Sequence, residues 1–120
     1  MSMRAVKIEP DGDIREVEIT GSDVSEQNDS IHEYLGGYFD IVYMGRDALM
    51  LVDDEGLLKE LPTNPLAMMI SGYPLLAGTA LIVGTQPGPE GDELCDVPER
   101  FIALTKELNG EGVPVWAADA

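Results

Sequence analysis

The side chains best suited to catalysis are scarce in this chain. His32 is its one histidine and Cys95 its one cysteine. Nucleophilic catalysis needs a nucleophile with a base oriented behind it. His32 falls beside Ile31 on a predicted helix, where a surface position is the commoner role. Acidic neighbours should raise the pKa of the Cys95 thiol and discourage thiolate chemistry. We therefore expect no enzymatic activity.

Carboxylates are abundant, and three clusters, at residues 11–13, 53–55 and 90–93, raise the question of a bound metal ion. None of them has the ligand spacing of a helix-flanked calcium loop. The first two fall in predicted turns, where turn geometry favours aspartate. The glycine-bounded segments at residues 72–78 and 78–84 lack the spacing of a dinucleotide-binding loop. We expect neither a metal nor a cofactor.

Net charge is the strongest global feature. Twenty-three acidic residues against seven basic ones give a formal net charge of −16. Such a surface repels phosphates, so we expect no direct contact with nucleic acid or with an anionic membrane. It attracts basic proteins, including those that themselves hold DNA. The same acidity could serve only solvation, for example in a salt-adapted host, and the sequence leaves this alternative open.

Chain length and cysteine content indicate the number of domains and the cellular compartment. One hundred and twenty residues are enough for one compact domain whose core needs no disulfide. The longest apolar run, residues 75–83, is too short to cross a bilayer, and no hydrophobic segment follows a basic amino terminus. A lone cysteine is typical of a cytoplasmic protein. We expect cytoplasmic residence and leave the oligomeric state open.

Period-two alternation predicts a hairpin at the start of the chain. Residues 4–8 and 14–19 alternate apolar and polar side chains around Asp11-Gly12, a strong tight-turn signal. Glu16 and Glu18 should face outward on the second of these strands. The hairpin therefore has an acidic outer face.

A short helix should follow, and two glycines should end it. Residues 21–28 are polar and are expected to form a loose stretch. Ser30 followed three residues later by Glu33 predicts a capping box. Gly36 should end the helix in the left-handed conformation, and Gly37 should let the chain reverse into a strand.

The middle of the chain predicts a meander and one more strand. Residues 39–44, 48–52 and 57–61 should form three strands joined by short polar turns. Residues 78–84 should form a further buried strand bounded by glycines. The following segment, residues 85–93, is rich in proline, glycine and acid and should be a flexible loop.

Two further helices have clear boundary signals. Asn64 as cap, Pro65 at the first helical position and Gly72 after the last turn predict one of them. Asp96 and Glu99 should cap the other, which Asn109-Gly110 ends.

Together these elements predict an α+β fold. We expect a mainly antiparallel sheet, made of the hairpin, the meander and one further strand, with two or three helices packed on one face. Residues 1–110 should form a single compact domain, and residues 111–120 a loose carboxy-terminal tail.

Three segments carry a resemblance to a known family. They are YLGGYFDIV at residues 34–42, LVDDEGLLKELPTN at 51–64 and AGTALIVGT at 77–85. In this order they resemble DUF3846, an uncharacterised family of bacteria and their phages, over most of residues 4–108. The resemblance implies a compact α+β domain, often carried on mobile elements, without an assigned activity. It supplies no catalytic residue.

Our first functional hypothesis is a non-enzymatic acidic binding protein of phage or mobile-element origin. It would engage a basic host protein, for instance as an inhibitor or nucleic-acid mimic, through its outward carboxylates. The candidate binding residues are Glu16, Glu18, Asp53, Asp54 and Glu55.

Two alternatives stay open. One is a small-molecule or nucleotide-binding domain with a glycine-lined pocket at the corner formed by Gly36, Gly37 and Tyr38. An anionic ligand would then need several arginines to converge, from the set Arg4, Arg15, Arg46 and Arg100. The other alternative is a protein whose acidity provides only solvation.

Overall fold

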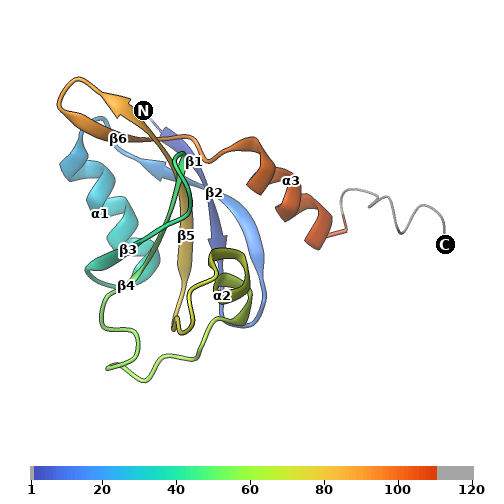
Figure 1. The fold of residues 1–120 in the computed structure, drawn as a ribbon. Coiled ribbons are helices and arrows are strands. Elements are labelled where there is room, and N and C mark those ends of the chain that lie inside the picture. The colour runs from blue at the N-terminus through green and yellow to red at the C-terminus, as the bar shows by residue number, and fades with distance from the viewer. Residues whose placement is uncertain (1, 111–120) are drawn as a thin grey trace, which may run out of the picture.

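The computed structural model describes residues 2–110, and within them six strands form one sheet with three helices against it (Figure 1). The strands are β1 Ser2–Ile8, β2 Ile14–Thr20, β3 Phe39–Tyr43, β4 Ala48–Asp53, β5 Ala80–Gly88 and β6 Gly91–Cys95. The helices are α1 Val24–Leu35, α2 Pro65–Ser71 and α3 Glu99–Leu108.

The sheet is antiparallel between all of these strands, in the order β2-β1-β5-β4-β3. β6 pairs with the second half of β5. This confirms the α+β class and the mainly antiparallel sheet. The tail expected at residues 111–120 lies outside the described residues.

Helices cover both faces of the sheet. On one face, Ile31 and Leu35 of α1 pack into a core with Leu81 of β5. On the other face, Phe101 of α3 belongs to a core with Ile82 of β5, and α2 lies against the same core. The expectation that the helices share a face holds for α2 and α3 but not for α1. The physical reason is that the central strands are apolar on both sides, so both sides must be covered.

Helix α1 begins earlier than the capping signals at Ser30 predicted. Asp23 is the cap, and its side chain accepts a hydrogen bond from the Glu26 N–H at 2.8 Å. Ser30 lies inside the helix, buried, and its hydroxyl accepts a bond from the Thr20 N–H. The helix ends as predicted at Gly36, whose φ of 84° is left-handed. Residues 24–26 are exposed and Gln27 and Asn28 only partly buried, so this first part of the helix shows no apolar period in the sequence.

The third strand of the meander is absent. Residues 57–61 belong to a turn in which the Lys59 N–H donates to the Glu55 carbonyl and the Leu61 N–H donates to the Gly56 carbonyl. We call residues 54–61 the leucine turn, because it carries Leu57 and Leu58. Two adjacent leucines do not fit a strand with one buried face, since neighbouring side chains point to opposite sides.

The segment expected to be a flexible loop after residue 84 is a hairpin instead. β5 continues to Gly88 and pairs there with β6, with Gln86 opposite Glu93. Gly84 marks the point where the chain crosses close to itself. A Cβ atom on Gly84 would lie 2.0 Å from the Asp96 carbonyl oxygen, so no larger residue fits without moving the backbone.

The caps of α2 and α3 differ in how well sequence predicted them. Asn64 caps α2 as expected, and its fully buried amide also donates to the carbonyls of Ile8 and Gly78. Asp96 does not cap α3. Its carboxylate instead accepts a bond from the Arg4 N–H at 2.9 Å, and Pro98 occupies the cap position without a side-chain bond. Asp96 therefore anchors the chain to β1 before α3 begins.

Candidate functional site

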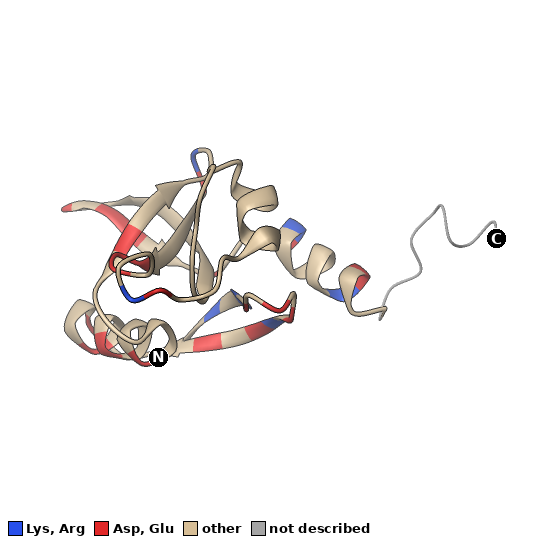
Figure 2. Cartoon of the chain, turned by 90° about the horizontal axis from the view of Figure 1, so that it is seen from below, with Lys and Arg blue, Asp and Glu red and all other residues tan. Residues whose placement is uncertain are grey.

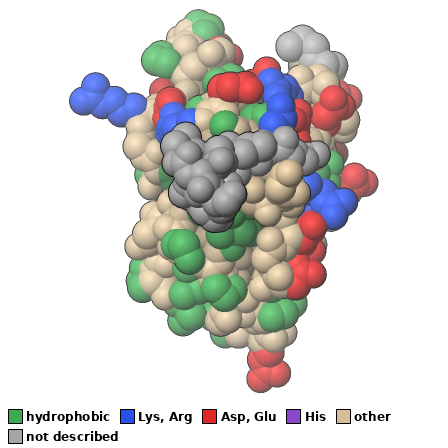
Figure 3. All heavy atoms as spheres, turned by 90° about the vertical axis from the view of Figure 1, so that its right-hand side faces the viewer, with side chains coloured by type: hydrophobic (Ala, Val, Ile, Leu, Met, Phe, Trp, Pro, Cys, Tyr) green, Lys and Arg blue, Asp and Glu red, His purple; other side chains and the backbone are tan. Residues whose placement is uncertain are grey.

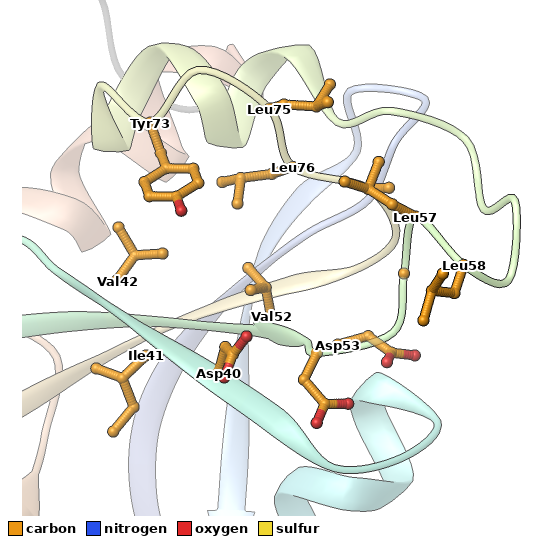
Figure 4. Close-up of a pocket in the computed structure, with 13 residues that line it drawn as sticks. Asp40, Ile41, Val42, Val52, Asp53, Leu57, Leu58, Tyr73, Leu75 and Leu76 are labelled. Atoms are coloured by element: carbon orange, nitrogen blue, oxygen red, sulfur yellow. The ribbon is translucent and has the colours of Figure 1, made fainter.

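A cleft of about 410 Å³ opens beside β3, where the sheet meets the leucine turn and the segment after α2 (Figure 4). Val42 and Val52 form its sheet side, and Leu76 lies opposite them. Its full lining is Asp40, Ile41, Val42, Val52, Asp53, Asp54, Gly56, Leu57, Leu58, Tyr73, Leu75, Leu76 and Ala77. The lining therefore comes from three segments far apart in the chain.

The walls of this cleft are apolar side chains that the fold leaves exposed. Leu57 is 54% exposed and Leu58 82% exposed on the leucine turn. Tyr73 and Leu75, on the other wall, are 49% and 46% exposed. Scattered single apolar residues on a surface are ordinary, whereas several around one hollow are typical of binding surfaces, so we take this cleft as the candidate site.

Hydrophobic side chains also gather on the face that carries α3. Figure 3 shows them over the lower part of the face on which α3 lies, with charged side chains above and to one side. Met69 of α2 is 77% exposed, yet it does not line the cleft. It therefore provides a matched control for the leucines that do.

An ion pair holds the leucine turn in place. Lys59 Nζ lies 2.8 Å from the Asp53 carboxylate, which is buried, and the Glu55 N–H donates to the other oxygen of Asp53. Burial acts to raise the pKa of the Asp53 carboxyl, but these two hydrogen bonds outweigh burial and the pKa is lowered. The bond to Asp53 raises the pKa of Lys59. Both groups are therefore charged at neutral pH, and they fix the turn that carries the leucines.

Carboxylates border the apolar walls. Asp40 of β3 and Asp54 of the leucine turn both line the cleft and both are exposed. Acidic residues recur in α1, along the strands and in the loops, while basic ones are few (Figure 2). The cleft thus combines an apolar interior with a negative border, which suits a ligand that carries both apolar groups and positive charge.

The residues predicted to form one acidic binding face lie in two places. Glu16 and Glu18 belong to β2, and Asp53, Asp54 and Glu55 lie at the end of β4 and just after it, beside the cleft. β2 and β3 are the two outer strands of the main sheet order, so the structure does not bring these groups together.

Two of the five acidic residues are already engaged. Glu16 accepts a hydrogen bond from Arg4 Nε at 2.9 Å, and Asp53 binds Lys59. Glu18, Asp54 and Glu55 are the exposed carboxylates of the predicted face that form no ion pair within residues 2–110.

The glycine corner is occupied by a side chain rather than open to a ligand. Lys59 Nζ lies 3.5 Å from the Gly36 carbonyl oxygen, and a Cβ atom on Gly37 would lie 3.1 Å from the same Nζ. The Tyr38 carbonyl accepts a bond from the Asp54 N–H. The corner therefore packs against the leucine turn, through Lys59 and Asp54.

The four arginines do not converge. Arg4, Arg15 and Arg100 are held by Glu16, Asp13 and Asp47, respectively, and none of the four, including Arg46, lines the cleft. A second hollow, of about 360 Å³ between the end of β2 and α1, is lined by three carboxylates and again by no arginine. Neither hollow therefore offers a basic pocket for an anionic ligand.

The residues considered for catalysis are placed in structural roles. The His32 ring packs edge-on against Tyr38, with centroids 5.1 Å apart, and against Phe39. Burial, and then the nearby carboxylates of Asp96 and Asp47, raise the pKa of the Cys95 thiol. Within residues 2–110, His, Cys, Asp and Glu side chains form no group of three or more that could hold a metal ion.

No helix in the described part of the chain is long and apolar enough to span a membrane.

Sequence reasoning missed the apolar half of the site. Leu57 and Leu58 were assigned to a strand, and Tyr73 and Leu75 were not singled out. The available signal was the pair of adjacent leucines after Asp53-Asp54-Glu55-Gly56, because an alternating strand buries only one of two neighbours. Nothing in the sequence indicates that residues 73 and 75 lie across from them.

Fold and site together define a small α+β domain with an acid-bordered apolar cleft at one edge of its sheet. Residues 3–109 match the family model described as "Domain of unknown function (DUF3846)", and the chain belongs to this family. No curated protein and no solved structure matches the chain.

Proposed function

We infer that this chain is a non-enzymatic acidic binding protein that engages a segment of a basic protein partner. The observation that supports this most strongly is the cleft, around which Leu57, Leu58, Tyr73 and Leu75 remain between 46% and 82% exposed. Burying such side chains against a partner is favourable, because it removes apolar surface from water.

The charge supports a basic partner. Asp40 and Asp54 border the apolar walls, and the chain as a whole carries −16. A partner with lysine or arginine beside apolar residues would find both kinds of contact in one place. Opposite charge would also speed its association.

The proposal extends to the biological setting. Membership of a family that we associate with bacteria, their phages and mobile elements favours a role in inhibiting or redirecting a host nucleic-acid-binding protein. Such a partner is basic, so the acidic surface would act partly by imitating phosphate charge. The lone Cys95 favours a cytoplasmic setting. A nucleotide ligand has less support, because no arginine lines either hollow.

A peptide selection tests this function, because a random library samples many candidate partner segments at once. The library of short peptides is selected on the immobilised wild-type protein after depletion on the bare support, so the selection itself does not favour the cleft. We expect enriched peptides that combine lysine or arginine with aliphatic or aromatic residues, and whose binding weakens as salt is raised.

The contrary results are equally clear. Enrichment of neutral or acidic peptides would remove the argument from charge. No enrichment at all would contradict the proposed function and leave solvation as the role of the acidic surface.

A further inference from the structure

The two outer strands of the main sheet differ in how they are protected. β2 carries Arg15, Glu16 and Glu18 with exposed side chains, and charge of this kind keeps another strand from pairing with an edge. β3 has a single charged residue, Asp40, between apolar and aromatic ones. β3 thus lacks the charges that protect β2, and it is the strand that borders the cleft.

The backbone of β3 offers unpaired hydrogen-bonding groups on its outer side. The Met44 N–H donates to the Ala48 carbonyl, and the Tyr38 carbonyl accepts from the Asp54 N–H, so residues 38 and 44 face β4. Because backbone groups alternate along a strand, those of Phe39, Ile41 and Tyr43 point away from β4. Within residues 2–110 no other strand pairs with β3 on that side.

Exposed apolar side chains lie on both faces of this edge. Val42 packs toward the core that α2 and α3 cover and points toward Tyr73 in the cleft (Figure 4). Ile41 points to the opposite side of β3, and it and Tyr43 are 45% and 75% exposed. An added strand would send alternate side chains to these two faces, so it would find apolar contacts on each.

We propose that the partner segment binds by strand addition, in extended conformation, as a new edge strand on Phe39–Tyr43. This mode rests on the proposed function and specifies its geometry. The alternate side chains of the segment enter the cleft beside Val42 and Tyr73, and the others cover Ile41 and Tyr43. Main-chain hydrogen bonds to Ile41 supply affinity, and the cleft supplies selectivity.

Charge determines the occupant. Asp40 belongs to β3, the strand beside which the segment would lie, and Asp54 borders the cleft. Lysine or arginine side chains in the segment pair with these two carboxylates. A second copy of this chain is the weaker candidate, because two molecules of net charge −16 repel each other. The segment therefore belongs to a basic protein.

The test uses the most enriched peptide from the library selection. A series of that peptide is made with one backbone amide N-methylated at a time, which removes one donor without changing any side chain. Strand addition predicts that methylation weakens binding at every second position, by roughly three- to tenfold for each lost hydrogen bond, and has little effect between them. Equal sensitivity at all positions, or at none, would overturn strand addition.

Amide hydrogen exchange of the protein measures whether the peptide forms hydrogen bonds with β3. With the peptide at about ten times its Kd, the N–H groups of Ile41 and Tyr43 should exchange about tenfold more slowly, because only the free protein leaves them open. Unchanged exchange at both would contradict the proposal.

A pair of variants at one position separates the backbone from the side chain. Ile41→Pro removes an outward N–H that is not used in the β3–β4 ladder, while Ile41→Ala keeps it. We expect the proline variant to bind more weakly than the alanine variant, and equal affinities would count against strand addition.

The measurements distinguish a failure of strand addition from a failure of the proposed function. If the peptide loses affinity for Leu58→Ser but shows no alternation and no amide protection, the cleft binds a segment in another conformation. If Leu58→Ser has no effect, the cleft is not the binding surface and both proposals fall. If light scattering finds two copies per particle and Ile41 is protected without peptide, β3 pairs with a second copy and the proposed occupant is wrong.

Discussion

Lys59 Nζ lies 2.8 Å from Asp53 Oδ2, and this contact joins the end of β4 to the leucine turn. The same ammonium lies 3.5 Å from the Gly36 carbonyl, so it also reaches the end of α1. The Asp53 side chain is 2% exposed, whereas that of Lys59 is 38% exposed. The pair therefore fixes the leucine turn, which forms one wall of the cleft, to the end of β4.

Asp53→Ala should destabilise the fold and loosen the leucine turn. The change removes the partner of Lys59 and leaves the Glu55 N–H without its acceptor, which we expect to cost about 1–3 kcal/mol in denaturant melts. Asp54→Ala is the matched control, because Asp54 is the exposed neighbour. Equal midpoints for the two variants would show that the pair contributes no stability.

The stabilising effect of Asp53 should depend on pH in a defined direction. Its pKa in the folded protein is lowered, so its contribution is present above the unfolded value of about 4 and is lost as the pH falls through the folded value. The raised pKa of Lys59 keeps that partner charged until the pH rises through its own folded value, above about 10. The difference in stability between wild type and Asp53→Ala should therefore stay constant from about pH 5 to 8 and shrink below about pH 4. A difference that grows on acidification would contradict this assignment.

Gly36→Ala should destabilise the protein through backbone conformation alone. The φ of 84° is unfavourable for alanine, while no atom lies within 4 Å of the position its Cβ would take. We expect a loss of about 1 kcal/mol or more in chemical denaturation. Gly37→Ala is the control, since its φ is not positive and its Cβ would meet only the end of the flexible Lys59 side chain. If both variants unfold at the wild-type midpoint, the capping argument fails.

Folding should not require a metal ion. The carboxylates of residues 53–55 bind Lys59 or backbone groups, or face solvent at a turn. Thermal melts with and without excess chelator should therefore overlay. A chelator that lowers the melting temperature by many degrees would identify a ligand set that both the sequence and the geometry missed.

Electrostatic steering should come from the cleft edge of the sheet. β2 is separated from β3 by four strand spacings, about 19 Å at roughly 4.8 Å each, whereas charges are screened over about 8 Å at physiological salt. Asp54→Lys should therefore slow association of the selected peptide by about tenfold and reduce the salt dependence of its rate. Glu18→Lys should change either quantity less.

Stopped-flow association rates over a salt series compare these two reversals. Glu18 is chosen over Glu16 because Glu16 binds Arg4, so its reversal would also place two positive charges together. A larger effect at Glu18 would return the steering surface to the outer face of the first hairpin, as the sequence alone suggested.

The sequence predicted those features of the fold that depend on a few neighbouring residues, such as turns and helix caps. The Asp11-Gly12 turn, the Asn64 cap of α2 and the left-handed Gly36 are each set by a few neighbouring residues, and each was predicted correctly. The start of α1 was missed because its first turns face solvent and show no apolar period. The Asp23 cap, three residues before Glu26, was the signal that remained.

Long-range contacts account for what sequence could not predict. Asp96 has the spacing of a helix cap, yet it binds the Arg4 N–H, 92 residues away in the chain. The cleft depends in the same way on Leu57 and Tyr73, which are distant in the chain and line one cleft only in the folded protein. The acidic cluster at residues 53–55 singles out Asp53 and Asp54 in the sequence, whereas Asp40 and the apolar walls become apparent only in the fold.

The central claim is that the acid-bordered cleft is the docking surface, and Leu58 tests it most directly. Leu58→Ser should leave thermal stability unchanged, because the side chain is 82% exposed. It should weaken the selected peptide by about tenfold or more, since a leucine buried on binding contributes about 1.5–3 kcal/mol. Met69→Ser removes a similarly exposed side chain outside the cleft and should bind as wild type does. The measurement is the Kd of the peptide for both variants by titration calorimetry. A tenfold loss confined to Leu58→Ser is the predicted result, and the same Kd for both variants would contradict the account.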